Sequence, residues 1–131
     1  MAAMTPMNRF AGILLCLCAA YADRAGAQVP AYPARIIRMV VPFPPGGGFD
    51  GIGRPFSEKL GAILGQPVLM DYRPGAGGNI GIEFAARAAP DGYTLLLANV
   101  SMATNPAILK TVNYDAVNDF APITRVGSIS S

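Results

Sequence analysis

Two clusters of glycine limit the possible folds of this chain more than any other feature, because each follows a short apolar run and neither suits a regular helix or strand. The first cluster ends the segment 42–48, which follows the β-branched run 36–41. The second, 75–78, comes shortly after the apolar run 68–70. Between them, apolar residues recur at helical spacing: Ile52, Phe56, Leu60, Ile63 and Leu64. This pattern predicts a strand, a glycine loop, a helix and a second strand.

The same order repeats after the second cluster. Asn79 can cap a helix that runs to about Ala88, with Glu83 near the positive end of its dipole. A turn signal at 90–92 precedes residues 93–98, which are apolar throughout, as in a strand covered on both faces. The βαβαβ order predicts an α/β fold with a mostly parallel sheet and right-handed crossovers. Ligands of such sheets bind beyond the carboxyl ends of the strands, and both glycine loops fall there.

The first 27 residues have the pattern of a cleaved signal peptide. Asn8 and Arg9 precede an apolar stretch at 10–20, which is too short to cross a bilayer. Small-residue cleavage sites end at Ala22 and Ala27, and the second is preferred. A retained membrane anchor is less favoured because the apolar core is short. We therefore expect export to the periplasm, and both cysteines of the chain leave with the leader.

The composition argues against several classes of function. Ten Lys and Arg against eight Asp and Glu give a net charge of +2 with no basic run, so nucleic-acid binding is not expected. The chain has no histidine, no Gly-x-Ser-x-Gly elbow and no carboxylates paired on one helical face. We therefore expect no catalysis, no metal site and no cofactor.

The first glycine cluster also matches the dinucleotide pattern Gly-x-Gly-x-x-Gly, with Asp71 after the next strand. Against this, residues 42–45 separate the strand from the first glycine, which the dinucleotide fingerprint places in a tight turn directly after the strand. Glycines that merely let a loop turn are the plainer alternative. We favour anion binding, because a glycine loop leading into a helix exposes backbone N–H groups with no side chain in the way. An organic carboxylate would then need no lysine, and neither loop contains a basic residue.

A set of longer segments carries a further resemblance. These segments are 32–35 (YPAR), 42–48 with Asp50, 65–68 (GQPV), 73–81 (RPGAGGNIG), 89–95 (APDGYTL) and 119–122 (DFAP). In this order and spacing they resemble the Bug family, the periplasmic solute receptors of tripartite tricarboxylate transporters. The resemblance covers the whole predicted mature chain. It implies a type II periplasmic-binding-protein fold, in which two α/β lobes close on a small carboxylate and deliver it to membrane permease subunits without chemistry.

The resemblance also implies which residues hold the ligand. Family members use the loop matching 44–50 and the loop after the third strand, here 99–104, to hold a carboxylate through backbone amides, hydroxyls and bridging waters. With the second glycine cluster included, the candidate ligand-binding residues are Pro44, Gly46, Gly47, Gly48, Asp50, Gly77, Gly78, Asn79, Ser101 and Thr104. Ordinary loop capping remains the alternative for the two hydroxyl residues. Asp50 is expected to organise amides rather than touch a carboxylate ligand.

Four positions depart from the family pattern. Phe49 replaces a small hydroxyl residue, and Met102 lies in a ligand loop that is often more polar. Gly53 and Pro55 stand where helix formers are usual, so a helix start at Pro55 is an alternative to an earlier one. The identity of the carboxylate, or acidic amino acid, is left open by these departures.

The domain prediction is a signal peptide at 1–27 followed by the N-terminal part of the first lobe at 28–131, with a fourth strand shortly before the end and no second lobe. A truncated receptor fits this length. A small exported α/β enzyme that processes carbohydrates or esters is the alternative from a different class, and a nucleotide-binding oxidoreductase lobe is a weaker one.

Overall fold

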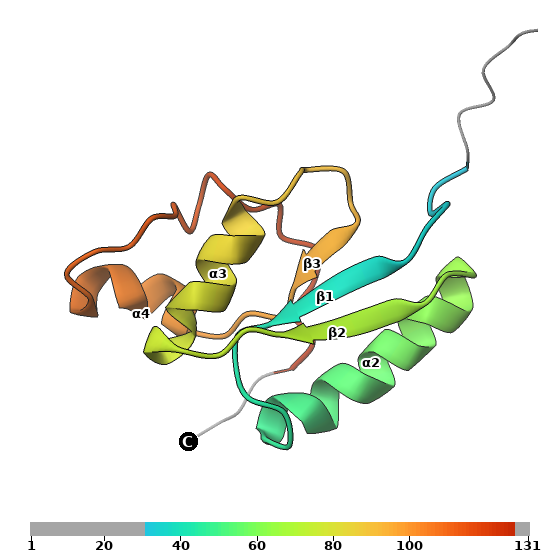
Figure 1. Cartoon of the computed structure of the whole chain (residues 1–131), viewed down its shortest axis with the longest axis horizontal. Helices are drawn as coiled ribbons and strands as arrows, with labels where there is room; N and C mark the ends of the chain where they lie inside the picture. Colours follow the sequence, from blue (N-terminus) through green and yellow to red (C-terminus); the bar gives the residue numbers. More distant parts are fainter. Residues whose placement is uncertain (1–30, 128–131) are drawn as a thin grey trace, which may run out of the picture. The chain divides into compact units, whose positions relative to one another are not determined.

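The computed structural model describes residues 31–127, so the predicted signal peptide lies outside the described residues. Short strands alternate with helices along the chain (Figure 1). The elements are β1 (Ile37–Val41), α2 (Gly48–Leu64), β2 (Val68–Tyr72), the 3-10 helix η1 (Ala76–Gly78), α3 (Asn79–Ala86), β3 (Thr94–Leu96) and α4 (Ser101–Ile108). Within residues 31–127, no helix combines the length and apolarity needed to cross a membrane.

The three strands form one parallel sheet in the order β2-β1-β3, which confirms the predicted βαβαβ arrangement. Met39 of β1 aligns with Met70 of β2 and Leu95 of β3. The buried apolar core is concentrated on the central strand and one helix: Ile37, Met39, Val40, Val41 and Ile82. Within β1, four of the five residues are buried and Arg38 is exposed, because the strand has a neighbouring strand on each side and a helix packs on it.

The two crossover helices cover opposite faces of the sheet (Figure 1). Side chains alternate along a strand, so Met70 and Leu97 share the face of Met39, and both lie against Gly53 of α2. α3 packs on the other face, where Gly81 lies against Pro42. α4 contacts α3. The chain therefore leaves β1 toward one face and β3 toward the other, and this switch point is where parallel sheets of this kind place a ligand crevice.

The first helix begins at Gly48, so the alternative start at Pro55 is wrong. Pro55 lies inside α2 on its exposed side. The preceding turns hold their helical conformation because Asp50 is hydrogen-bonded to the loop before the helix and Gly53 packs against Met70. These contacts offset the hydrogen bond that proline cannot donate.

The buried face of α2 also differs from the apolar stripe in the sequence. Small and polar residues, Asp50, Gly53 and Ser57, are the buried ones. Two residues of the apolar stripe, Ile52 and Ile63, are 44% and 81% exposed. A face of small residues lets the helix approach the sheet closely, and hydrophobic periodicity does not detect it.

Three smaller expectations for the second half need correction. The N-cap of α3 is Gly78 and not Asn79, and Glu83 lies beyond the first turn. β3 covers only Thr94–Leu96, and its residues are half-buried, not enclosed on both faces. Residues 109–127 contain no strand, so the expected fourth strand is not formed there.

The irregular segment after α4 is held by hydrogen bonds to both neighbouring helices. The Tyr114 hydroxyl donates to the Met102 carbonyl at 2.9 Å. Pro106 has no N–H with which to satisfy that carbonyl within α4, so the tyrosine supplies the missing donor. Glu83 of α3 accepts hydrogen bonds from the backbone and side chain of Asn113 at 3.1 and 3.2 Å. These contacts fix the orientation of α4 and its first turn.

Candidate ligand-binding site at the carboxyl ends of the strands

Each of the three strands leads into a short connection and then a helical start on the same edge of the sheet (Figure 1). The first N–H groups of a helix have no partner within the helix. At α3 and α4 these groups already have local acceptors, because the N–H groups of Gly78, Asn79 and Ser101 donate to Gly75, Ala76 and Asn99. The first loop is exposed from Pro44 to Gly48. The start of α2 therefore offers exposed backbone donors next to the positive end of a helix dipole.

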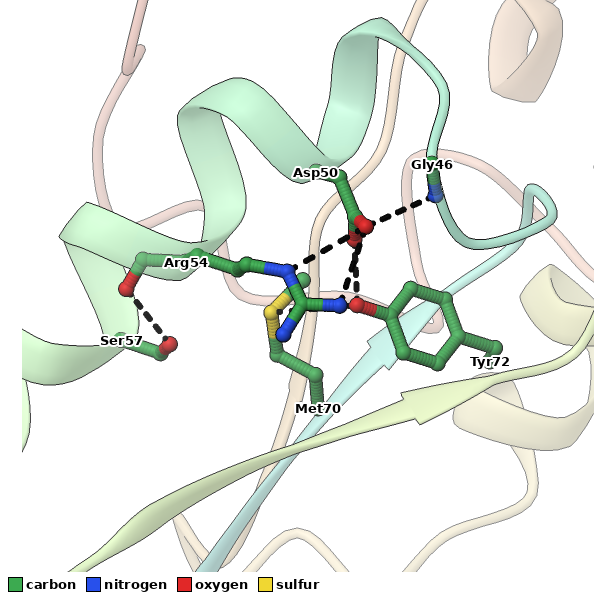
Figure 2. A network of polar contacts seen from close by, with 6 residues as sticks. All are labelled: Gly46, Asp50, Arg54, Ser57, Met70 and Tyr72. Atoms are coloured by element: carbon green, nitrogen blue, oxygen red, sulfur yellow. Dashed lines mark hydrogen bonds and ion pairs between the residues drawn. The ribbon is translucent and has the colours of Figure 1, made fainter.

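A buried carboxylate organises the first loop. The Asp50 side chain is 12% exposed, and its carboxylate accepts a hydrogen bond from the Gly46 N–H at 2.7 Å. Nε and Nη2 of Arg54 donate to the same carboxylate at 3.2 and 3.1 Å. The Tyr72 hydroxyl also donates to it. Figure 2 shows this network, which ties the loop after β1 to α2 and to the end of β2. These contacts agree with the expected role of Asp50 as an organiser of amides.

The network sets the charge states of its members. The hydrogen bond from Tyr72, together with those from Gly46 and Arg54, holds the pKa of the Asp50 carboxyl below its usual value. The same Tyr72–Asp50 hydrogen bond, followed by burial, raises the pKa of the Tyr72 hydroxyl. At neutral pH, Asp50 is therefore ionised, Tyr72 keeps its proton, and the charge of Arg54 balances that of Asp50.

The second glycine loop lies beside the start of α4. Gly75, Gly77 and Gly78 adopt positive φ angles of 127°, 63° and 90°, which other residues adopt only with strain. A Cβ on Gly78 would lie 3.4 Å from the Phe43 ring and 3.4 Å from the Ser101 hydroxyl. The structure thus brings Gly78 and Ser101 together, with Phe43 linking them to the first loop.

Three further predicted site residues have other polar contacts. The segment 99–104 is a loop only up to Val100, because α4 starts at Ser101, and the exposed Thr104 hydroxyl donates to the Val100 carbonyl at 3.3 Å. The Asn79 side chain is buried and donates to Glu83 at 2.7 Å. Gly77 accepts a hydrogen bond at its carbonyl from Asn105, at 3.3 Å. Ligand roles for all these residues stay predictions.

Several residues that shape the site were not among the predicted ones. Arg54 and Tyr72 hold Asp50, and Asn99 accepts hydrogen bonds from both the N–H and the hydroxyl of Ser101. The spacing of Asp50 and Arg54, four residues apart on one helix, is a signal from which the ion pair could have been predicted. Tyr72 lies 22 residues from Asp50 and gives no such signal.

The geometry does not favour the dinucleotide interpretation. β1 ends at Val41 and α2 begins at Gly48, so no tight turn joins the strand to the helix. The acidic residue that would bind a ribose, Asp71, forms ion pairs with Arg38 at 3.5 Å and Arg73 at 3.0 Å. The glycine loop in this chain is therefore longer and differently anchored than a dinucleotide site requires.

A shallow, open groove of about 400 Å³ lies at the opposite edge of the sheet. It is lined by Ser57, Glu58, Gly61, Gly65, Gln66, Pro67 and Val68. These residues surround the end of α2 and the start of β2, whereas parallel sheets bind ligands at the carboxyl ends of their strands. In the part of the chain that the structure covers, no three His, Cys, Asp or Glu residues gather into a metal-binding group.

Comparison with known proteins identifies the family of the chain. The family model described as "Tripartite tricarboxylate transporter family receptor" matches residues 52–131, more than half of the chain. Protein BugT of Bordetella pertussis is 38% identical over 125 residues, which cover 94% of this chain and 38% of that protein.

Solved structures agree with the sequence relatives. The periplasmic binding protein BugD is 41% identical with a TM-score of 0.68, over 70% of this chain and 31% of that one. MatC from Rhodopseudomonas palustris, solved with bound malate, is 32% identical with a TM-score of 0.62, over 70% of this chain and 31% of that one. The aligned part of this chain spans only 28% to 38% of the curated relatives that it matches. The α/β unit is thus part of a periplasmic-binding-protein fold, and the chain belongs to the tripartite tricarboxylate transporter receptor family.

Proposed function

We propose that this chain is the N-terminal part of a periplasmic receptor that binds a small organic carboxylate or acidic amino acid and performs no chemistry on it. The receptor would hand its ligand to the membrane permease subunits of a tripartite transporter. Membership of the receptor family supports this function, and the malate held by MatC supports the ligand class.

The observation that carries the proposal is the open start of α2. Gly46, Gly47 and Gly48 are exposed, and a Cβ on Gly46 or Gly48 would meet nothing within 4 Å. A carboxylate can therefore approach these amides without displacing a side chain. Asp50 is nearby, but Arg54 balances its charge, so it does not repel the ligand as a lone anion would.

Each predicted residue then has a role. Gly47 and Gly48 donate their backbone N–H groups to the ligand. The Gly46 N–H donates to Asp50 and so anchors the loop, and Pro44 restricts the backbone that precedes these glycines. Gly78 and Ser101 form the facing side of the site, and the Ser101 hydroxyl would turn from Asn99 to donate to the ligand. The remaining candidates, Gly77, Asn79 and Thr104, position the second loop and the first turn of α4 or contact the ligand through water.

We expect the 131-residue chain to bind weakly by itself. The matched part of this chain corresponds to only 31% of BugD and of MatC, so these residues supply only part of the surface around a ligand. A hydrogen bond to an anion in contact with water contributes on the order of 1 kcal/mol net, and a few such bonds correspond to roughly millimolar dissociation constants.

A two-dimensional NMR titration of the full chain tests the ligand class at this affinity. Malate should shift the amide signals of Gly46, Gly47 and Gly48 in a saturable way, while glucose and NAD should not. Amide signals in the groove near Gly65 serve as an internal control, because they lie at the other edge of the sheet. Shifts caused by NAD with none from malate would contradict the proposal.

Export is tested separately by expressing the full sequence in a Gram-negative host. Fractionation and intact-mass measurement should recover a periplasmic product that begins at Gln28. Recovery of the uncleaved chain in the membrane fraction would contradict the proposed processing.

A further inference from the structure

A pair of aromatic rings lies between the two glycine loops. Phe43 follows β1, and Phe49 lies in the first turn of α2. Their ring centroids are 4.3 Å apart and their planes differ by 17°, so the rings are stacked. Both side chains are partly exposed. The stack therefore presents apolar surface at the edge of the sheet where the chain is otherwise rich in glycine.

The pair adjoins the backbone donors of both loops. Phe49 directly follows the exposed Gly48 in the chain. Cζ of Phe43 would lie 3.4 Å from a Cβ on Gly78, and the Ser101 hydroxyl would lie equally close to that Cβ. An anion held at Gly47 and Gly48 would thus have the aromatic surface beside it.

We propose that Phe43 and Phe49 form an apolar wall that selects carboxylates carrying an aromatic ring. This inference rests on the proposed function, since it takes the amides of the first loop as the carboxylate site. The carboxylate would lie on those amides, and the ring of the ligand would pack on the exposed side of the phenylalanine pair in an offset or edge-to-face arrangement.

The same surface offers no donor to a second carboxylate at that end of the ligand, so a dicarboxylate such as malate would bind the loop amides through one carboxylate and gain nothing from the rings. A carboxylate placed against the rings would lose water without gaining a donor, and the faces of aromatic rings carry partial negative charge. The nearest cation of the network, Arg54, is already engaged by Asp50 at 3.1 Å. The site therefore has a polar end made of backbone amides and an apolar end made of two rings.

Three small probes separate these two ends. Acetate carries only the carboxylate, benzyl alcohol carries only the ring, and phenylacetate carries both. NMR titrations of the full chain should give a dissociation constant for phenylacetate about tenfold below that for acetate, since packing one ring removes apolar surface from water. Benzyl alcohol should leave the amides of Gly46, Gly47 and Gly48 unshifted.

Replacement of one ring tests the wall directly. Phe49→Thr should reduce the preference for phenylacetate over acetate roughly fivefold, the size of a typical aromatic pair interaction. Phe49→Leu keeps an apolar side chain and should show a smaller loss. Phe120→Thr removes one ring of a second aromatic pair, with Tyr114, outside the site, and should leave the preference intact.

The outcomes distinguish this inference from the proposed function. If acetate and phenylacetate shift the loop amides with equal affinity, the carboxylate site stands and the aromatic wall is wrong. An unchanged preference in a folded Phe49→Thr or Phe49→Leu variant would equally overturn it, because the pair would then be purely structural. If no carboxylate shifts the loop amides at all, both proposals fail.

Discussion

The two glycine loops of this protein use the same residue for different physical reasons. In the first loop, a Cβ on Gly46 or Gly48 would meet open space, only Gly46 has a positive φ, of 83°, and the carboxylate of Asp50 fixes the backbone. In the second, Gly75 and Gly78 adopt positive φ and are crowded by neighbouring side chains. Glycine thus leaves room for a ligand in the first loop, whereas the second needs it for its own packing and backbone conformation.

The largest loss of stability is expected at a glycine whose close neighbours are backbone and proline ring atoms. A Cβ on Gly81, which follows the second loop in α3, would lie 2.8 Å from Cβ of Pro42 and 2.9 Å from the Arg73 carbonyl oxygen. Backbone atoms cannot move aside cheaply, so Gly81→Ala should lower the free energy of unfolding by about 3 kcal/mol, as overpacking does. Urea unfolding of the full chain measures it.

The matched control is Gly51→Ala in α2, where a Cβ would meet nothing within 4 Å. This change should raise the free energy of unfolding by about 0.5 kcal/mol, because alanine favours a helix more than glycine does. Equal changes in the free energy of unfolding for Gly81→Ala and Gly51→Ala would contradict the distinction between a crowded and an open glycine.

Much of the fold could be predicted from the sequence, whereas several contacts at the candidate site could not. The strands, the glycine loops and the parallel order follow from apolar runs and turn residues, which are local signals. The early start of α2 and the side chains that hold Asp50 depend on contacts between distant residues, such as Tyr72 with Asp50. Likewise, the start of α4 at Ser101 is set by its packing on α3 and by Asn99, and not by its own weak helical pattern.

The next effect concerns pH and the anchor of the first loop. The folded pKa of Asp50 is lowered, so its contribution to stability is full above the unfolded value of about 4 and is lost as pH falls through the folded pKa. The pKa of Tyr72 is raised, so its contribution is full below about 10 and is lost as pH rises through its folded pKa. The Gly46 amide signal should therefore stay constant between these limits and move outside them.

Substitutions identify the groups responsible. Asp50→Asn should abolish the acid transition of the Gly46 amide and lower the melting temperature of the chain. Asp115→Asn is the control: Asp115 also has a lowered pKa, caused by Asn118 and neighbouring backbone N–H groups in a turn far along the chain. An acid transition of Gly46 that survives Asp50→Asn would show that another group anchors the loop.

A smaller effect is expected from Tyr72→Phe, which removes one donor to Asp50 and keeps the ring. The hydrogen bonds from Gly46 and Arg54 remain, so the loop should stay ordered and the pKa of Asp50 should rise toward its usual value. A shift of the acid transition of the Gly46 amide to higher pH measures this change. No shift would mean that Tyr72 contributes nothing to the ionised state of Asp50.

The most direct test of the account is the affinity for malate of three full-length chains, measured by NMR titration: wild type, Gly48→Ala and Gly51→Ala. Because the open start of α2 is proposed to hold the carboxylate, Gly48→Ala should weaken malate binding at least several-fold without loss of stability, while Gly51→Ala should bind as the wild type does. Wild-type affinity in a folded Gly48→Ala chain, or malate-induced shifts confined to the groove near Gly65, would contradict the central claim.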